Sequence, residues 1–217
     1  MELKGLKINF LGDSITQGVG VRHIEDTYWN KIAQKSGAIC RGYGVSATRI
    51  ARNFSDKKEE TESRYFNSRV DEMDRDADVV VVFGGTNDYG HGDAPMGNIN
   101  DTDEYTFYGA YNTLVQHLFE NFPDARLVIM TPLHRCGENE PINEIGVRNV
   151  SNLYGYVEAI RNIARKYAIP VIDLYENSGI NAKNTEQIIK YIPDGLHPNE
   201  SGTERMADYI IAQLKTF

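Results

Sequence analysis

The sequence is poor in cysteine, has no long apolar run and carries no excess of positive charge, and each absence excludes a class of protein. Two cysteines in 217 residues, Cys40 and Cys136, are too few for a disulfide framework, so we expect two reduced thiols. No apolar run approaches the roughly 18 residues of a membrane-spanning helix, and we expect no membrane partner. The formal net charge of −8 argues against nucleic acid as a partner, because phosphate binding needs clustered Lys and Arg.

The usual signatures of export, metal binding and nucleotide binding are also missing. Residues Met1–Gly5 show no basic stretch followed by a long apolar core and a small-residue cleavage site, so we expect a cytoplasmic protein. There is no His-x-x-x-His, no cysteine cluster and no Asp-rich calcium loop, which predicts no metal and no cofactor. The glycine-rich turn Gly12–Gly20 lacks the Gly-Lys-Ser/Thr ending of a phosphate-binding loop and places an acidic residue where the anion would bind.

What the sequence does contain is an alternation of short apolar runs with longer amphipathic ones. The short runs predict strands over Ile8–Leu11, Ala38–Tyr43, Asp78–Phe83, Arg126–Met130 and Val171–Leu174. The amphipathic runs predict helices over Tyr28–Ala33, Thr106–Asn121 and Val147–Tyr167, and from Asn199 to the last apolar position at Leu214. This alternation, in a chain of this length, predicts a single α/β domain over residues 1–217, with a parallel sheet covered by helices on both faces.

Two further segments differ in composition from their surroundings. Residues Asp56–Glu62 form a charge run, which we expect to be a solvated helix face or loop. Residues Tyr89–Tyr105 are rich in Gly, Asp and Asn, and they follow Asp78–Phe83, the clearest predicted strand. Long loops in compact domains are often functional, so we expect Tyr89–Tyr105 to border a functional site.

Small and polar residues follow three of the predicted strands. Gly12–Thr16 follows the first, Gly44–Thr48 the second and Gly84–Asp88 the third, while Pro193–Pro198 precedes the last helix. The carboxyl ends of parallel strands meet at one edge of the sheet, where ligands bind. Each signal alone is weak, because a serine after a strand is usually a helix N-cap and an asparagine after a glycine is usually a turn residue. Their combination in this order predicts a site at that edge.

Three of these segments carry a family resemblance. Gly12-Asp13-Ser14-Ile15 resembles the nucleophile motif of the GDSL/SGNH hydrolases, Gly85–Asp88 resembles their Gly-x-Asn-Asp block, and Asp194–His197 resembles their Asp-x-x-His block. The blocks occur in the family's order and span residues 12–197. The resemblance implies a flavodoxin-like, three-layer α/β/α sandwich and the activity of a serine esterase.

The resemblance also assigns the three roles of a serine triad. Ser14 is the expected nucleophile, His197 its general base and Asp194 the carboxylate that orients the imidazole. An ordinary imidazole has a pKa of about 6.5, which suits a base at neutral pH. Of the five histidines only His197 has an Asp at the family's spacing, whereas His91 and His134 lie on loops near the expected site and are candidates for substrate contact.

Three hydrogen-bond donors for the oxyanion of the tetrahedral intermediate follow from the same resemblance. They are the backbone amide of Ser14, the side-chain amide of Asn87 and one backbone amide from the second segment. The family usually has glycine at that last position, but the alignment of Gly42–Ala47 places Ala47 there, and Gly44 falls three residues too early. An alanine amide can donate as well as a glycine amide provided that φ is negative, so we expect Ala47 to be the third donor.

Five neighbouring residues receive expected roles from their positions. Asp13 and Asp88 flank the triad and oxyanion positions, and we expect them to bond loop backbones and hold the shape of the site rather than act in catalysis. Thr86, Tyr89 and His91 are the expected substrate-binding residues, on the ground that they adjoin the Asn87 block.

The expected activity is hydrolysis of small carboxylic esters through an acyl-enzyme on Ser14, with acetylated carbohydrates as the preferred substrate class. The loops at 89–105 and 134–149 are polar and aromatic, which suits a sugar better than a lipid tail. A lipase-like or thioesterase-like hydrolase is the alternative within the family. A non-catalytic, flavodoxin-like binding module is the alternative outside it, because one fold hosts many functions. A small-molecule ester is thus the expected partner.

Overall fold

In a computed structural model that describes residues 1–55 and 65–217, five parallel strands form one sheet in the order β2-β1-β3-β4-β5. The charge run at 56–62 lies outside the described residues. The strands are β1 (Lys7–Gly12), β2 (Ile39–Gly44), β3 (Val79–Phe83), β4 (Arg126–Met130) and β5 (Val171–Ile172). All five lie where the sequence predicts strands, and every pairing is parallel.

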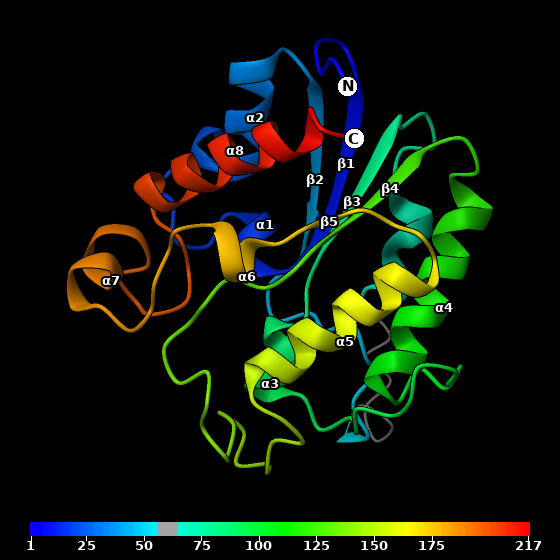
Figure 1. Cartoon of the computed structure of the whole chain (residues 1–217), viewed down its shortest axis with the longest axis vertical. Coiled ribbons are helices and arrows are strands. Elements are labelled where there is room, and N and C mark those ends of the chain that lie inside the picture. Colours follow the sequence, from blue (N-terminus) through cyan, green and yellow to red (C-terminus); the bar gives the residue numbers. More distant parts are fainter. Residues whose placement is uncertain (56–64) are drawn as a thin grey trace.

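Helices cover both faces of this sheet (Figure 1). The longer ones are α2 (Tyr28–Ser36), α4 (Phe107–Asn121), α5 (Leu153–Lys166) and α8 (Glu200–Leu214). Shorter ones are α1 (Ser14–Gln17), α3 (Thr86–His91), α6 (Leu174–Asn177) and α7 (Thr185–Tyr191), with 3-10 turns η1 (Ile24–Asp26) and η4 (Asn67–Glu72). Helices α2 and α8 pack together on one face, and α4 and α5 lie on the other. The expected three-layer α/β/α sandwich is therefore confirmed.

The central strand shows how the sequence builds two cores. All five side chains of β3 are buried, because helices cover both faces of the sheet. Val80 and Val82 belong to the core under α4 and α5, whereas Val79, Val81 and Phe83 belong to the core under α2 and α8. This division follows from the two-residue period of a strand, which sends alternate side chains to opposite faces.

Two predicted boundaries are wrong, and a side-chain cap explains each. The last strand ends at Ile172 instead of Leu174, because the Asp173 side chain accepts a hydrogen bond from Glu176 N and starts α6. Helix α5 begins at Leu153 instead of near Val147, because Asn152 caps it. The chain before it is held in turns, with the Asn143 side-chain oxygen accepting from two backbone amides.

The strand order brings the three polar segments together. Strand β1 pairs with β2 on one side and with β3 on the other, so the direction in which strands are added to the sheet reverses at β1. Ligand sites of open parallel sheets lie at such a switch, outside the carboxyl ends of the strands. The residues that follow β1, β2 and β3 are therefore neighbours. Among the described residues, no helix is both long and apolar enough to cross a membrane.

Candidate active site

Ser14 lies in the tight turn that joins β1 to α1. Asp13 caps the helix, its carboxylate accepting a hydrogen bond from Ile15 N at 3.0 Å. Gly12 is required for steric reasons, because a Cβ atom at this position would lie 2.0 Å from the Thr16 hydroxyl oxygen. The turn places Ser14 as the first residue of α1, only 4% exposed, at the carboxyl edge of the sheet.

Ser14, His197 and Asp194 form a continuous hydrogen-bonded chain. Ser14 Oγ lies 3.0 Å from His197 Nε2, and His197 Nδ1 lies 2.7 Å from Asp194 Oδ2. With Nδ1 protonated and bonded to the carboxylate, Nε2 is free to accept the hydroxyl proton. The expected base therefore lies within reach of the expected nucleophile, and its orientation is set by the third residue of the motif.

The loop before α8 holds the Asp194 carboxylate in place. Its Oδ1 atom accepts from Leu196 N at 2.9 Å and from His197 N at 2.7 Å, while Oδ2 faces the imidazole. Partial burial would raise the pKa of Asp194, but these three hydrogen bonds outweigh it and lower the pKa below its usual value. Asp194 is thus ionised at neutral pH. Cys136 N donates to Gly195 O at 2.7 Å and ties this loop to the segment after β4.

The three expected oxyanion donors come from segments at the carboxyl edge of the sheet: Ser14 follows β1, Ala47 follows β2 and Asn87 lies in α3 after β3. Among the described residues, neither the Ser14 N–H nor the Ala47 N–H donates a hydrogen bond. The Asn87 side-chain nitrogen donates one of its two hydrogens to Thr48 O at 2.8 Å, which leaves the second hydrogen for another acceptor. Their joint contact with one negatively charged oxygen stays a prediction.

The expectation about the backbone of Ala47 was wrong. Its φ is +61°, in the left-handed region, whereas we expected a negative value. Ala47 is the third residue of a turn closed by Thr48 N donating to Val45 O at 3.4 Å, and a type II turn requires positive φ at that position. This requirement explains why glycine suits the position, and Ala47 meets it at the expense of strain.

Sequence reasoning missed a buried arginine that joins these segments. Arg69, in η4, donates to Tyr43 O at 2.8 Å, to Gly12 O at 3.1 Å and to the Thr48 hydroxyl at 3.0 Å. Burial lowers its pKa to about 10, so it remains charged at neutral pH. Thr48 O in turn accepts from Asn87. Arg69 and Thr48 therefore link the three segments that carry the expected oxyanion donors. Two of the partners of Arg69 are backbone carbonyls, which leave no signal in a sequence.

The two aspartates beside the site bond loop backbones. Asp13 caps α1, and the Asp88 carboxylate accepts from Ile50 N at 3.0 Å and from Ala51 N at 2.8 Å. Burial raises the pKa of Asp13 to about 7 and that of Asp88 to about 6. Their contacts are those of residues that hold the shape of the site.

The three expected substrate-binding residues have polar atoms that already bond the protein. The Thr86 carbonyl accepts from Arg135 at 3.3 Å, and the buried Tyr89 donates its hydroxyl proton to Gly137 O. His91 Nε2 lies 3.2 Å from Ala47 O, so this nitrogen carries the proton, and burial lowers the pKa of His91. His91 therefore steadies the turn of Ala47. Substrate contact by these residues stays a prediction.

Within residues 1–55 and 65–217, no set of three or more His, Cys, Asp or Glu side chains is placed to hold a metal ion. The acidic and histidine side chains of the site are used instead in the hydrogen bonds given above.

Solved structures of other proteins share this architecture. A protein from Lactobacillus plantarum is 27% identical, with coverage of 98% of both chains and a TM-score of 0.82. The acetyl xylan esterase AlAXEase is 24% identical, with coverage of 95% of this chain and 98% of its own and a TM-score of 0.62. The lipase/acylhydrolase from Enterococcus faecalis is 19% identical, with coverage of 97% and 96% and a TM-score of 0.63.

No protein of curated function matches the chain. The sequence model of the GDSL-like lipase/acylhydrolase family matches residues 10–205, which include all three expected triad residues and the Gly-x-Asn-Asp block. The matched region is far more than half of the chain, and the protein therefore belongs to the GDSL-like lipase/acylhydrolase family.

Proposed function

We propose that this protein is a serine esterase that hydrolyses small carboxylic esters, acetyl esters above all, through an acyl-enzyme on Ser14. The observation that carries the proposal is the unbroken chain from Ser14 Oγ through His197 to the ionised Asp194. A serine hydroxyl becomes nucleophilic only when a positioned base removes its proton, and this chain supplies such a base.

The geometry supports a two-step reaction. His197 Nε2 takes the hydroxyl proton as Ser14 Oγ attacks the ester carbonyl, and the N–H groups of Ser14, Ala47 and Asn87 hold the oxyanion. His197 then gives the proton to the alcohol oxygen, the C–O bond breaks and the acyl group stays on Ser14. Water attacks this acyl-enzyme with His197 as base, which releases the carboxylic acid and restores the serine. Asp194 stabilises the imidazolium in both steps.

The preference for acetyl esters of carbohydrates rests on two supports. The chain shares its fold with an acetyl xylan esterase that is 24% identical to it. The segments 89–105 and 134–149 are rich in polar side chains, which suit hydroxyl-rich substrates. We therefore expect a short acyl group and a polar alcohol.

A second candidate is the hydrolysis of longer acyl esters. The segment between β4 and α5 exposes three aliphatic side chains, with Ile142 59%, Ile145 52% and Val150 52% exposed. Exposed apolar side chains gathered on one segment can mark a binding surface for apolar groups. The p-nitrophenyl esters of acetate, butyrate and octanoate separate the two candidates, because the first predicts that kcat/KM falls with chain length and the second that it rises.

The triad is tested by the same assay on three variants. Ser14→Ala and His197→Ala should lower kcat for p-nitrophenyl acetate by at least about 10³-fold, and Asp194→Asn should leave a measurable remnant. His23→Ala, at an exposed histidine outside the site, is the matched control and should keep full activity. A fluorophosphonate probe should label the wild type and not Ser14→Ala. Near-full activity of His197→Ala, or absence of labelling, would refute the proposal.

A further inference from the structure

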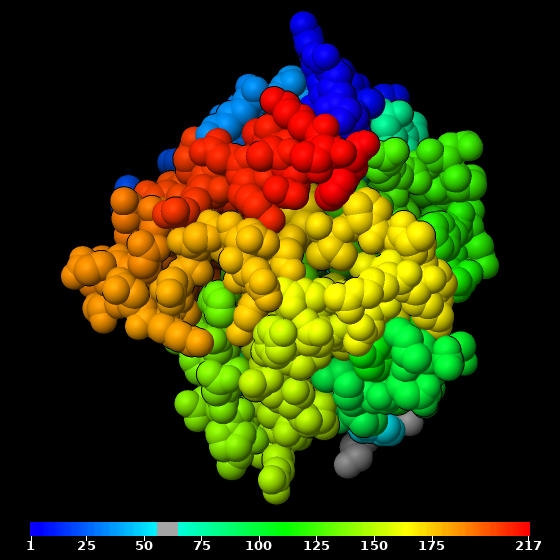
Figure 2. All heavy atoms as spheres, in the orientation of Figure 1, coloured from blue at the N-terminus to red at the C-terminus, as the bar shows by residue number. Residues whose placement is uncertain are grey.

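The segment between β4 and α5 packs against α3, the helix that contains Asn87. In Figure 1 it is the yellow-green chain that leaves β4 and passes α3 before it enters α5, and in Figure 2 its green and yellow-green atoms are at the surface. Arg135, near the start of this segment, has a side chain that is only 9% exposed. Its Nη1 atom lies 3.3 Å from the carbonyl oxygen of Thr86, and its Cζ atom lies 5.7 Å from the centre of the Tyr89 ring. The guanidinium group therefore lies against one face of α3.

Gly90 leaves the space that the guanidinium of Arg135 occupies. Thr86, Tyr89 and Gly90 share one face of α3, because residues three and four apart are neighbours on a helix. A Cβ atom at Gly90 would lie 2.6 Å from Arg135 Nη1, so a side chain there would displace the guanidinium. The carboxylate of Glu144 accepts from Arg135 Nη2, and Glu144 N donates to Gly90 O at 2.9 Å. Arg135 is thus held on α3 by its ion pair as well as by the helix itself.

Helix α3 depends on outside contacts for its position. It has six residues with low helix propensity, and its N-cap is Gly85, which has no side chain to cap it. Asp88 anchors the helix to the backbone at Ile50 and Ala51. At 100° per residue, position 88 points away from the face that Arg135 covers. Asp88 and Arg135 therefore restrain opposite sides of the same short helix.

The contact of Arg135 with Thr86 acts on the residue that follows. The Thr86 carbonyl belongs to the peptide group that ends at Asn87 N, so a hydrogen bond to this oxygen restrains the backbone of Asn87. The side chain of Asn87 is restrained separately, because it donates to Thr48 O at 2.8 Å. Oxyanion donors act at about 2.7–3.1 Å from the oxygen, so a small shift of Asn87 would weaken its bond.

The next residue of the same segment contacts the loop that carries Asp194 and His197. Cys136 N donates to the carbonyl oxygen of Gly195 at 2.7 Å, and Gly195 lies between the two triad residues of this loop. The packing is close, because a Cβ atom at Gly195 would lie 2.8 Å from Cys136 Sγ. Two consecutive residues of one segment therefore bond the helix of Asn87 and the loop of His197.

We propose that Arg135 is a positioning residue for Asn87. Together with Cys136, it holds this oxyanion donor in place relative to His197. During the reaction Asn87 bonds the oxyanion while His197 moves the proton between Ser14 and the alcohol oxygen, so both side chains must be in place at the same time. Arg135 acts through the backbone of α3 and not by contact with the reacting atoms. This inference rests on the proposed function.

The test is a double-mutant cycle on kcat for p-nitrophenyl acetate. Arg135→Met removes the guanidinium and should lower kcat by about tenfold or more, with KM changed by less than about twofold. Asn87→Ala should lower kcat by about 10²–10³-fold. Because Arg135 acts through Asn87, Arg135→Met added to Asn87→Ala should lower kcat by less than about twofold further. Arg161→Met, at an arginine that is 12% exposed and paired with carboxylates away from the site, is the matched control and should leave kcat unchanged.

Gly90→Ala keeps the test decisive if Arg135→Met fails to fold. The added methyl group meets the end of a flexible side chain, and alanine favours a helix more than glycine does, so this variant should fold. It displaces the guanidinium and should lower kcat by about threefold or more at unchanged KM. Unchanged kcat in every folded variant, or a loss as large in Asn87→Ala as in the wild type, would overturn the positioning role even if Ser14 cleaves p-nitrophenyl acetate. Absence of Ser14-dependent ester turnover in the wild type would instead overturn the proposed function itself.

Discussion

Ala47 combines the amide that we propose as an oxyanion donor with a strained backbone. A residue with a Cβ atom at φ +61° is strained by about 1–2 kcal/mol, and replacement by glycine removes this strain. Glycine also gives the unfolded chain more freedom, which lowers the gain in stability by roughly 0.4–1 kcal/mol. We expect Ala47→Gly to raise the free energy of unfolding by roughly 0.5–1 kcal/mol. Esterase activity should stay within about twofold, because the N–H is retained. Urea unfolding and p-nitrophenyl acetate turnover measure the two effects.

Ala168 is the matched control for this substitution. It has a φ of +54° just after α5, and it is the other non-glycine residue with positive φ in the described chain. Ala168→Gly should give a similar gain in stability with no effect on turnover, since Ala168 has no part in the site. If Ala47→Gly were less stable than the wild type, or lost more than tenfold in kcat, the account of Ala47 as a strained donor would be wrong.

The sequence indicates those candidate residues whose side chains carry the proposed chemistry. Ser14, Asn87 and His197 belong to blocks with recognisable spacing, and the structure brings them to one edge of the sheet. Arg69 could not be found in this way, because an arginine is usually exposed and its partners here include backbone carbonyls of residues far away in sequence. The positive φ of Ala47 depends on the turn in which it lies, which the residue type alone does not indicate.

Among the elements, strands were predicted well and short helices poorly. Strands β3 and β4 are buried on both faces, so they appear as continuous apolar runs. Helix α3 was not predicted, because its sequence Thr-Asn-Asp-Tyr-Gly-His has low helix propensity. Tertiary contacts stabilise it instead: Asp88 bonds the backbone at Ile50 and Ala51. The first residues of the expected loop at 89–105 are therefore helical.

The turn after β2 depends on η4 for its position, and Thr48 is the link. The Thr48 hydroxyl accepts from Arg69 at 3.0 Å and donates to Val45 O at 2.7 Å. Thr48→Val keeps the shape of the side chain and removes both bonds, so we expect a loss of about 1–3 kcal/mol in stability. The turn that carries Ala47 should also loosen, which lowers kcat for p-nitrophenyl acetate about tenfold with little change in KM.

Thr27→Val is the control that distinguishes a loss of overall stability from a loss of position of the turn that carries Ala47. The Thr27 hydroxyl is equally buried, donates to Ile24 O at 2.8 Å and accepts from Asn30 at 3.2 Å, but it lies away from the oxyanion donors. This variant should lose similar stability while kcat stays unchanged. Equal effects of the two substitutions on kcat would show that Thr48 acts only through overall stability.

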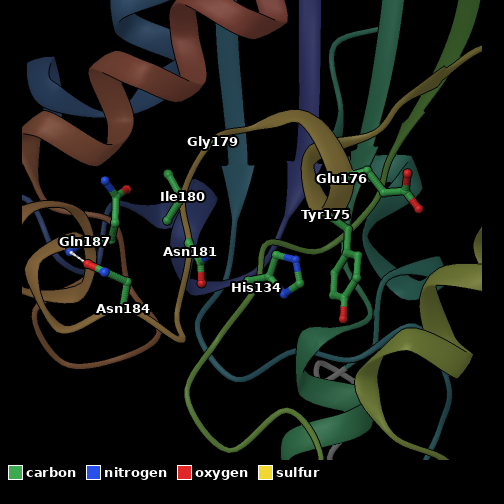
Figure 3. A pocket seen from close by; sticks show the side chains of 8 residues that line it. All are labelled: His134, Tyr175, Glu176, Gly179, Ile180, Asn181, Asn184 and Gln187. Carbon is green, nitrogen blue, oxygen red and sulfur yellow. Dashed lines mark hydrogen bonds between the residues drawn. The ribbon is translucent and has the colours of Figure 1, made fainter.

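For the whole molecule, the topology follows from the sequence and the position of a cavity does not. Alternating strands and helices predict a parallel sheet, and a parallel sheet brings the polar segments after β1, β2 and β3 to one edge. A cavity between the segment after β4 and α7 is lined by His134, Tyr175 and Gln187, which come from separate connections whose paths depend on packing (Figure 3). Only His134 drew notice in the sequence, from its place on a loop near the site.

Stability of the whole fold should depend on pH through two buried carboxyls. Burial raises the pKa of Asp13 to about 7 and that of Asp88 to about 6, whereas both are near 3.9 in an unfolded chain. Between about pH 4 and pH 7 the folded state therefore binds more protons than the unfolded state. By linkage, the free energy of unfolding falls as pH rises through this window, by at most roughly 4 kcal/mol for Asp13.

Asp194 acts in the opposite sense at lower pH. Its pKa is lowered in the folded state, so its contribution to stability is present above about pH 4 and is lost as pH falls through the folded pKa. The raised pKa values of Asp13 and Asp88 and the lowered pKa of Asp194 together favour a maximum in the free energy of unfolding near pH 4–5. Urea unfolding from pH 3.5 to pH 8 should show this maximum.

Asp13→Asn isolates the contribution of Asp13, the carboxyl whose pKa is raised more and whose effect on the pH dependence of stability is larger. Asparagine keeps an oxygen that can accept from Ile15 N but has no carboxyl to titrate, so the fall in stability from pH 5 to pH 8 should become shallower, while Asp88 still contributes. The difference between variant and wild type at pH 8, taken relative to pH 5, measures the contribution of Asp13. Wild-type stability that rises steadily from pH 5 to pH 8, or a variant with the slope of the wild type, would mean that Asp13 ionises normally in the folded protein. In that case Asp13 would be charged beside Ser14 at neutral pH.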